Sequence, residues 1–237
     1  MNKSLPVHSS YINYLPLFFL ICLSGNPFFT DQGFSKMLLV VYSAFFSIYV
    51  FKKMGWMLSM KIVDKLIILI AFVLIIVVAQ KSTLKFVSYP GVFALILKIL
   101  LGFFTIYFYQ LKKMDILDAY ITILAVLSFV SIPFFILNQF GFYGFQFNEI
   151  KTIILFTFRE KVSQEGIVRS SGMFWEPGAY AGYLVLALLL IALKNGKFTP
   201  GAYKKESFWI VMALISTQST TGYLILLLTF TMHALQN

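Results

Sequence analysis

The sequence predicts an all-α membrane protein, a polytopic bundle of about seven transmembrane helices with one long extracytoplasmic loop. The first observation behind this is composition. Of 237 residues, 59% are hydrophobic and 12% charged, and the mean hydropathy is +0.85. An average soluble domain carries roughly 25% charged residues. A water-soluble globule of this composition would expose large apolar patches, and a disordered chain requires low hydrophobicity. Composition therefore excludes both a soluble enzyme and a disordered chain.

The second observation is the set of apolar segments. Seven of them approach the roughly 20 apolar residues that a spanning helix needs. They lie near Tyr11–Leu23, Met37–Phe51, Val63–Ala79, Phe86–Tyr109, Ile116–Phe140, Met173–Leu193 and Phe208–His233. No small-residue cleavage site follows the first apolar run, so we expect a retained helix there and not a cleaved signal peptide.

The third observation is the placement of the basic residues. With the N-terminus in the cytoplasm, eleven of the 19 Lys and Arg residues fall on the cytoplasmic side and seven outside, and Lys98 lies within a span. This bias favours that orientation, and the net charge of +10 is read as a topology signal and not as a nucleic-acid surface. The whole chain, 1–237, is predicted to be one membrane domain. Because it ends directly after a span, we expect it to be the N-terminal part of a larger architecture.

Both arginines of the chain lie in the predicted extracytoplasmic loop, 141–172. Elsewhere the positive charges are lysines. A guanidinium grips phosphate or carboxylate with two parallel hydrogen bonds, which an ammonium cannot do. Arg159 and Arg169 are therefore candidate ligand-binding residues. The alternative is that they are solvated or pair with Glu160 and Glu165.

The loop leads into a helix predicted to start at Pro177, because proline suits the first helical turn. Glu176 then lies near the N-cap, where it either caps the helix or directs a carboxylate at a substrate hydroxyl. The free N–H groups of this helix end also favour an anion. Gly178 and Gly182 have the four-residue spacing of close helix packing.

Two polar features fall inside predicted spans. Ser216–Gly222 is a run of seven polar or small residues, which is typical of a break or a polar cavity. The alternative is an ordinary helix whose hydroxyls bond to carbonyls one turn earlier. Lys98 is a candidate functional residue, or a charge paired within the bundle. There is one cysteine, Cys22, and no Cys/His cluster with metal-ligand spacing, so we expect no metal site.

Two motifs carry a resemblance to a known family. The pattern Arg-x-x-Gly-x-Phe-x-Glu-Pro-Gly, from Arg169 to Gly178, followed by a small-residue helix, resembles the O-antigen polymerase and O-antigen ligase superfamily. Ser219-Thr220-Thr221-Gly222-Tyr223 is similar to the Ser/Thr–Gly element of that family. The resemblance covers roughly residues 170 to 225, and the remainder agrees in hydropathy alone.

The resemblance implies a multi-pass protein of the bacterial inner membrane. It implies transfer of a glycan from an undecaprenyl-diphosphate-linked oligosaccharide to an acceptor glycan at the outer face, without a metal or other cofactor. Partners would be the lipid bilayer and other polysaccharide-assembly membrane proteins, and not nucleic acid. Arg169 matches the motif arginine, and Glu176 is the candidate catalytic residue. Further candidate substrate-binding residues are Arg159, Lys98, Ser219 and Thr220.

The sequence does not distinguish a polymerase from a ligase. It also leaves open that the chain is an incomplete member of the family without activity. Two other classes of function also remain. A transporter or flippase of a lipid-linked saccharide would account for Lys98 and for the polar last span. A structural or assembly membrane protein would have no site at all.

Overall fold

The computed structural model describes residues 11–26, 33–54, 89–147, 150–161, 164–196 and 201–236, with short stretches between 67 and 78. The chain divides into two compact units. The larger comprises Met1–Asp31 together with Asp115–Asn237, and the smaller comprises Gln32–Met114. Both arginines therefore belong to the larger unit.

The larger unit is built on helices whose ends follow local chemistry. Asp115 caps the first long helix, because its carboxylate accepts a hydrogen bond from the Leu117 N–H at 2.8 Å. The next long helix has proline in its first turn and ends at Gly196, whose φ of 65° is left-handed. The described helices are η1 (Tyr11–Tyr14), α1 (Leu15–Gly25), α6 (Ile116–Gln139), α7 (Pro177–Asn195), η2 (Gly201–Tyr203), α8 (Lys204–Thr217) and α9 (Thr220–Gln236).

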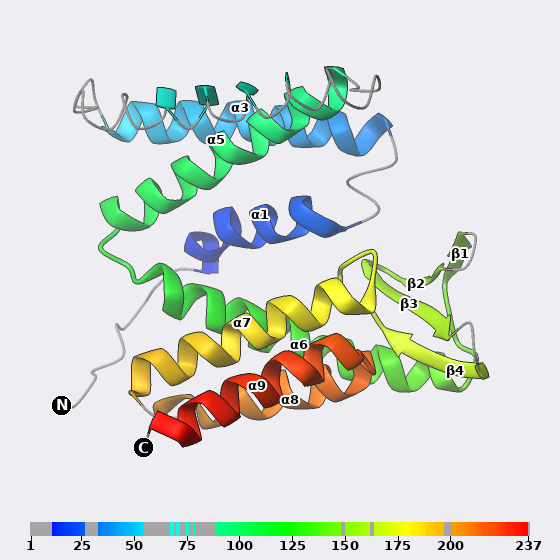
Figure 1. The fold of residues 1–237 in the computed structure, drawn as a ribbon. Coiled ribbons are helices and arrows are strands. Elements are labelled where there is room, and N and C mark those ends of the chain that lie inside the picture. The colour runs from blue at the N-terminus through cyan, green and yellow to red at the C-terminus, as the bar shows by residue number, and fades with distance from the viewer. Residues whose placement is uncertain are drawn as a thin grey trace. The chain divides into compact units, whose positions relative to one another are not determined.

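Helices α6, α7 and α8 pack against one another and form the core of this unit (Figure 1). The core combines apolar side chains with a buried polar contact. Tyr180 of α7 is fully buried, and its hydroxyl lies 3.2 Å from the Ser131 hydroxyl of α6. The fully buried apolar side chains of these three helices include Ile121, Leu124, Leu184, Ile210 and Leu214.

A four-stranded antiparallel sheet occupies the segment that was predicted to be a loop. Its strands are β1 (Phe145–Phe147), β2 (Ile150–Ile153), β3 (Phe156–Lys161) and β4 (Gln164–Ser170), and they pair in chain order as a meander. The sheet is inserted between the end of α6 and the start of α7, and Figure 1 shows it beside these helix ends. The loop prediction is wrong because residues 150–158 are rich in threonine, isoleucine and phenylalanine, which favour strands.

The smaller unit contains α3 (Gly33–Met54) and α5 (Tyr89–Leu111), which pack together. Aromatic rings form part of this contact, and the centroids of Phe46 and Phe108 lie 5.8 Å apart. The predicted span Val63–Ala79 falls largely outside the described residues.

The seven-span bundle is wrong. Among the described residues, two helices are long and apolar enough to cross a membrane, α6 with 24 residues and α7 with 19. Helices α1, α8 and α9 have 11, 14 and 17 residues. At about 1.5 Å per residue, each is shorter than a hydrocarbon core of about 30 Å. Apolar composition predicted these spans, but these three helices are too short for them. The predicted spans Met37–Phe51 and Phe86–Tyr109 fall in α3 and α5, whose apolar stretches among the described residues, Val40–Val50 and Ile96–Leu111, are also shorter than a span.

The segment predicted as the last span, Phe208–His233, is broken. Gln218 has a φ of 47° and separates α8 from α9. The hydroxyls of Ser216 and Thr217 also donate to the carbonyls of Ala213 and Leu214, each at 2.7 Å. The predicted break is therefore confirmed and the ordinary helix is wrong, although the hydroxyls before the break do bond back to their own helix.

Candidate functional site

The two arginines are direct cross-strand partners. Arg159 of β3 pairs with Arg169 of β4 in the antiparallel register. Residues directly opposite one another have Cα atoms about 4.5–5.5 Å apart and side chains on the same face of the sheet. Like charges in this position are destabilising unless something of opposite sign lies between them. The register thus creates a concentrated positive charge suited to an anion.

The face that carries the arginines is polar along β3 and β4. Thr157 lies two residues before Arg159 and is fully buried. Ser171 follows Arg169 by two residues, is also fully buried, and donates its N–H to the Thr157 carbonyl at 2.9 Å. Because strand side chains alternate, these four residues share one face. The Ser171 hydroxyl and the Arg159 Nε are buried without a partner among the described residues, which leaves donors for a ligand.

Arg169 is held in place by the broken segment between α8 and α9. Its Nε donates to the Thr217 carbonyl at 3.2 Å. Thr217 is the last residue of α8, and the negative end of a helix dipole favours a cation there. A bond through Nε leaves the two terminal nitrogens of the fork for a ligand. The Arg169–Gly178 motif and the polar run Ser216–Gly222 therefore meet in the fold, through two residues that are 48 apart in the sequence.

Ser219 and Thr220 lie directly after this contact. Ser219 is buried and acts as the N-cap of α9, because its hydroxyl accepts from the Gly222 N–H at 3.3 Å. Thr220 is the first residue of α9 and is exposed. Ser219 thus has a structural task, while Thr220 is open to a ligand on the surface of the helix start.

Glu176 occupies the N-cap of α7, and Pro177 lies in the first turn, as the sequence predicted. The side chain makes no capping hydrogen bond. The main-chain carbonyl of Glu176 accepts the Tyr180 N–H at 3.2 Å, and the side chain is half-buried. Of the two alternatives for Glu176, the side-chain cap is therefore wrong, and the carboxylate is available for another contact.

Close helix packing occurs at a different glycine from those predicted. A Cβ at Gly182 would meet nothing within 4 Å, and one at Gly178 would meet only the Glu176 carboxylate at 3.8 Å. A Cβ at Gly222 would lie 2.7 Å from the Cβ of Ala181. Gly222 thus brings α9 against α7.

Lys98 lies half-buried in α5 of the smaller unit. The proposed pairing of the arginines with Glu160 and Glu165 involves side chains outside those described. Sequence reasoning missed the Thr217 carbonyl and Tyr223, which lies within electrostatic reach of Arg169. A strand interpretation of 150–158 could have predicted the arginine register, but no sequence signal identifies a carbonyl acceptor 48 residues away.

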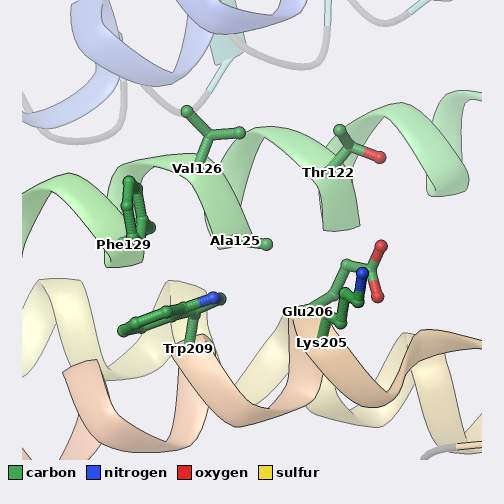
Figure 2. A pocket seen from close by; sticks show the side chains of 7 residues that line it. All are labelled: Thr122, Ala125, Val126, Phe129, Lys205, Glu206 and Trp209. Carbon is green, nitrogen blue, oxygen red and sulfur yellow. The ribbon is translucent and has the colours of Figure 1, made fainter.

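A groove between α6 and α8 lies apart from the arginines. Figure 2 shows Trp209 and Phe129 facing each other across it, with their ring centroids 4.8 Å apart. Its lining is mostly apolar, with one lysine and one glutamate at one end, namely Thr122, Ala125, Val126, Phe129, Lys205, Glu206 and Trp209. In the part of the chain that the structure describes, no group of three or more His, Cys, Asp or Glu side chains could hold a metal ion.

No protein-family model matches the chain, and no curated protein or solved structure matches it either. The resemblance to the polymerase and ligase superfamily therefore depends on the two motifs alone.

Proposed function

We propose that this chain is a polysaccharide polymerase-like membrane protein. In this proposal Arg159 and Arg169 bind the diphosphate of an undecaprenyl-diphosphate-linked oligosaccharide. The observation that carries the proposal is the cross-strand arginine pair, with Arg169 anchored through Nε. Two adjacent guanidinium forks match a dianionic or trianionic diphosphate better than a single carboxylate, because each fork takes two oxygens.

Two helices suited to a bilayer support the membrane part of the proposal. In both α6 and α7, 39% of the apolar window is buried inside the protein. The remaining residues of each window are exposed or partly buried, and exposed apolar surface indicates lipid or partner contact. In this proposal the protein lies in the bacterial inner membrane, with the sheet on the extracytoplasmic side.

The chemistry proposed is glycosyl transfer. An acceptor hydroxyl attacks the anomeric carbon of the donor, the bond from that carbon to the diphosphate oxygen breaks, and the diphosphate leaves with the electron pair. The arginines would stabilise the charge that grows on the leaving group. The Glu176 carboxylate would accept the hydroxyl proton.

Binding to a polyprenyl diphosphate tests the proposal independently of turnover. The protein is purified in detergent and titrated with a short-chain polyprenyl diphosphate, and the matching monophosphate serves as the comparison ligand. Hydrogen bonds to charged groups contribute about 1.5–3 kcal/mol, so Arg169→Ala should weaken diphosphate binding by about 10- to 100-fold. Arg169→Lys should be nearly as damaging, because the fork is lost.

Lys161→Ala is the matched control, since it removes a positive charge from the same strand as Arg159 and should leave affinity nearly unchanged. Diphosphate affinity that is equal in wild type and Arg169→Ala would overturn the proposal. A loss of the same size in Lys161→Ala would indicate a diffuse charge effect and would overturn the bidentate grip.

The break between α8 and α9 favours transport of a lipid-linked saccharide as a second candidate. Discontinuous helices form the binding sites of many transporters, and Gln218 interrupts this segment. Reconstituted vesicles distinguish the two functions, because a flippase moves a labelled lipid-linked saccharide between leaflets without forming a longer glycan.

A further inference from the structure

Exposed apolar side chains gather at one end of the sheet. Five residues, each between 45% and 75% exposed, form what we term the apolar rim: Phe142, Tyr143, Phe145, Ile154 and Trp175. In water such a concentration is unfavourable, because large exposed apolar patches promote association with another apolar phase. The position of these residues in the fold indicates whether that phase is lipid or another protein surface.

The strand register brings the rim together from three separate segments. Phe142 and Tyr143 lie in the connection from α6 to β1, whose first residue, Phe145, pairs with Thr152 near the end of β2. Ile154 lies in the adjoining β2–β3 turn, because Ile153 pairs with Phe156.

Trp175 comes from beyond the far strand. Ser171 bonds to Thr157 at the start of β3, so the chain leaves β4 at the same end of the sheet. The Trp175 N–H then donates to the carbonyl of Gly25, the last residue of α1, at 2.8 Å. The rim therefore lies at the end of the sheet from which the chain enters α7.

The rim lies beside exposed apolar side chains of a membrane-length helix. Phe134 of α6 contacts Phe156 at the start of β3, with ring centroids 5.3 Å apart, and Ile136 and Leu137 in the following turn are exposed. Trp175 lies two residues before the start of α7. Aromatic side chains at the ends of spanning helices favour the membrane–water interface. Lys151 adds a cation there, with its Nζ 5.1 Å from the centroid of the Tyr143 ring, as expected for an amine near lipid headgroups.

The β2–β3 turn has the chemistry of an inserted tip and not of a solvent-exposed turn. Ile154 has a φ of 56°, a conformation that β-branched residues rarely adopt, and it is 69% exposed. Two-residue hairpin turns usually place glycine, asparagine or aspartate at such a position. An exposed isoleucine in a strained turn is unfavourable twice over in water, and transfer of its side chain into lipid offsets part of that cost.

We propose that the apolar rim inserts into the interface of one leaflet of a lipid bilayer, so that the sheet stands on the membrane surface. Arg159 lies three residues beyond Phe156 along β3, about 10 Å above the rim at roughly 3.3 Å per residue. The arginine pair then lies just outside the headgroups, where the diphosphate of a lipid carrier projects. This last step depends on the proposed diphosphate binding, whereas insertion of the rim does not.

Spin labels at Ile150, the first residue of β2, and at Ile154, in the turn that follows this strand, test the insertion. Cys22, the single cysteine, is replaced by alanine, and Ile154→Cys and Ile150→Cys are labelled separately. Each protein is reconstituted into nanodiscs of phosphatidylcholine and phosphatidylglycerol. Collisions of the label with oxygen, which partitions into lipid, are compared with collisions with a water-soluble nickel chelate. No saccharide donor is present, so the outcome is independent of diphosphate binding.

We expect the oxygen-to-nickel collision ratio to be several-fold higher at position 154 than at position 150, which lies about 13 Å further from the turn. Equal ratios at the two positions would overturn the proposal. Shielding of position 154 from both reagents would indicate a protein partner and would also overturn it.

A second measurement uses the native Trp175 and requires no change in the rim. Trp56 and Trp209 are replaced by phenylalanine, and Trp175 emission is recorded in vesicles whose phosphatidylcholine is brominated either near the headgroup or near the terminal methyl. Quenching should be stronger with bromine near the headgroup. Emission equal to that in unbrominated vesicles would place Trp175 in water and overturn the inference.

Discussion

At the residue scale, Glu176→Gln tests whether the Glu176 side chain contributes to stability or to the chemical step. Its side chain makes no capping hydrogen bond, so Glu176→Gln should change stability by well under the roughly 1 kcal/mol of a typical cap. If the carboxylate accepts the acceptor proton, the same change should lower turnover by about 10²–10⁴-fold. The measurement is polymer formed per amount of membrane protein in a complemented deletion strain. Wild-type polymer from the glutamine variant would leave Glu176 without a chemical role.

Alanine substitutions at Gly222 and Gly182 test the close packing of α9 against α7, because only the first glycine has a neighbour at close range. Gly222→Ala places a Cβ 2.7 Å from the Cβ of Ala181, and overpacking of this kind costs about 1–3 kcal/mol. Gly182→Ala meets nothing within 4 Å and should be neutral or stabilising by up to about 1 kcal/mol, since alanine favours helix. Thermal unfolding in detergent compares the two variants. Equal melting temperatures for both would contradict the proximity of α7 and α9.

An ionic cluster joins three helices at the end opposite the sheet. The Lys194 ammonium near the end of α7 bonds both Asp115 and Asp118 of the α6 start, and its distance to the Asp118 carboxylate is 2.5 Å. The Tyr203 hydroxyl, just before α8, donates to the same Asp118 carboxylate. Burial acts to raise the pKa of Asp115, but the hydrogen bonds from Lys194 and the Leu117 N–H, with the charge of Lys194, outweigh it and lower that pKa.

The sign of this shift predicts how pH affects the cluster. Because the pKa of Asp115 is lower in the folded protein, its stabilisation is present above the unfolded carboxyl pKa of about 3.9. It is lost as the pH falls through the folded value. Asp115→Asn keeps a favourable N-cap and removes the charge, so it should cost about 0.2–1 kcal/mol at pH 7. The free energy of unfolding is measured for the wild type and Asp115→Asn from pH 7 to about pH 2, and the difference between the two proteins should shrink as the pH falls. A difference that does not change with pH would contradict the ion pair.

For the whole molecule, we expect α6 and α7 each to cross the membrane, so that the segments before and after each helix lie on opposite sides of it. The sheet follows α6 and precedes α7, whereas Gly196 follows α7. Reporter fusions after Gln164 should be active with an extracytoplasmic enzyme, and fusions after Gly196 with a cytoplasmic one. The positive-inside bias gives this direction. Activity of both fusions with the same reporter would show that α7 does not cross the membrane.

The amino-acid sequence was enough to predict the apolar character of the chain, long helices within Ile116–Phe140 and Met173–Leu193, and the start of α7 at Pro177. These depend on composition and on the residue preferences of helix ends, which act over a few residues. It also singled out both arginines, because no other residue of that type occurs. It overestimated the number of spans, because apolar composition does not report where a helix ends.

The arrangement of the two arginines follows from tertiary contacts and could not be predicted from the sequence. Their pairing depends on the register of β3 and β4, and the anchor of Arg169 is a main-chain carbonyl at the end of α8. A carbonyl has no side-chain signature, and register is set by pairing over the whole sheet. The rim likewise unites segments from either end of the meander. Such contacts arise from long-range packing, which the order of residues alone does not specify.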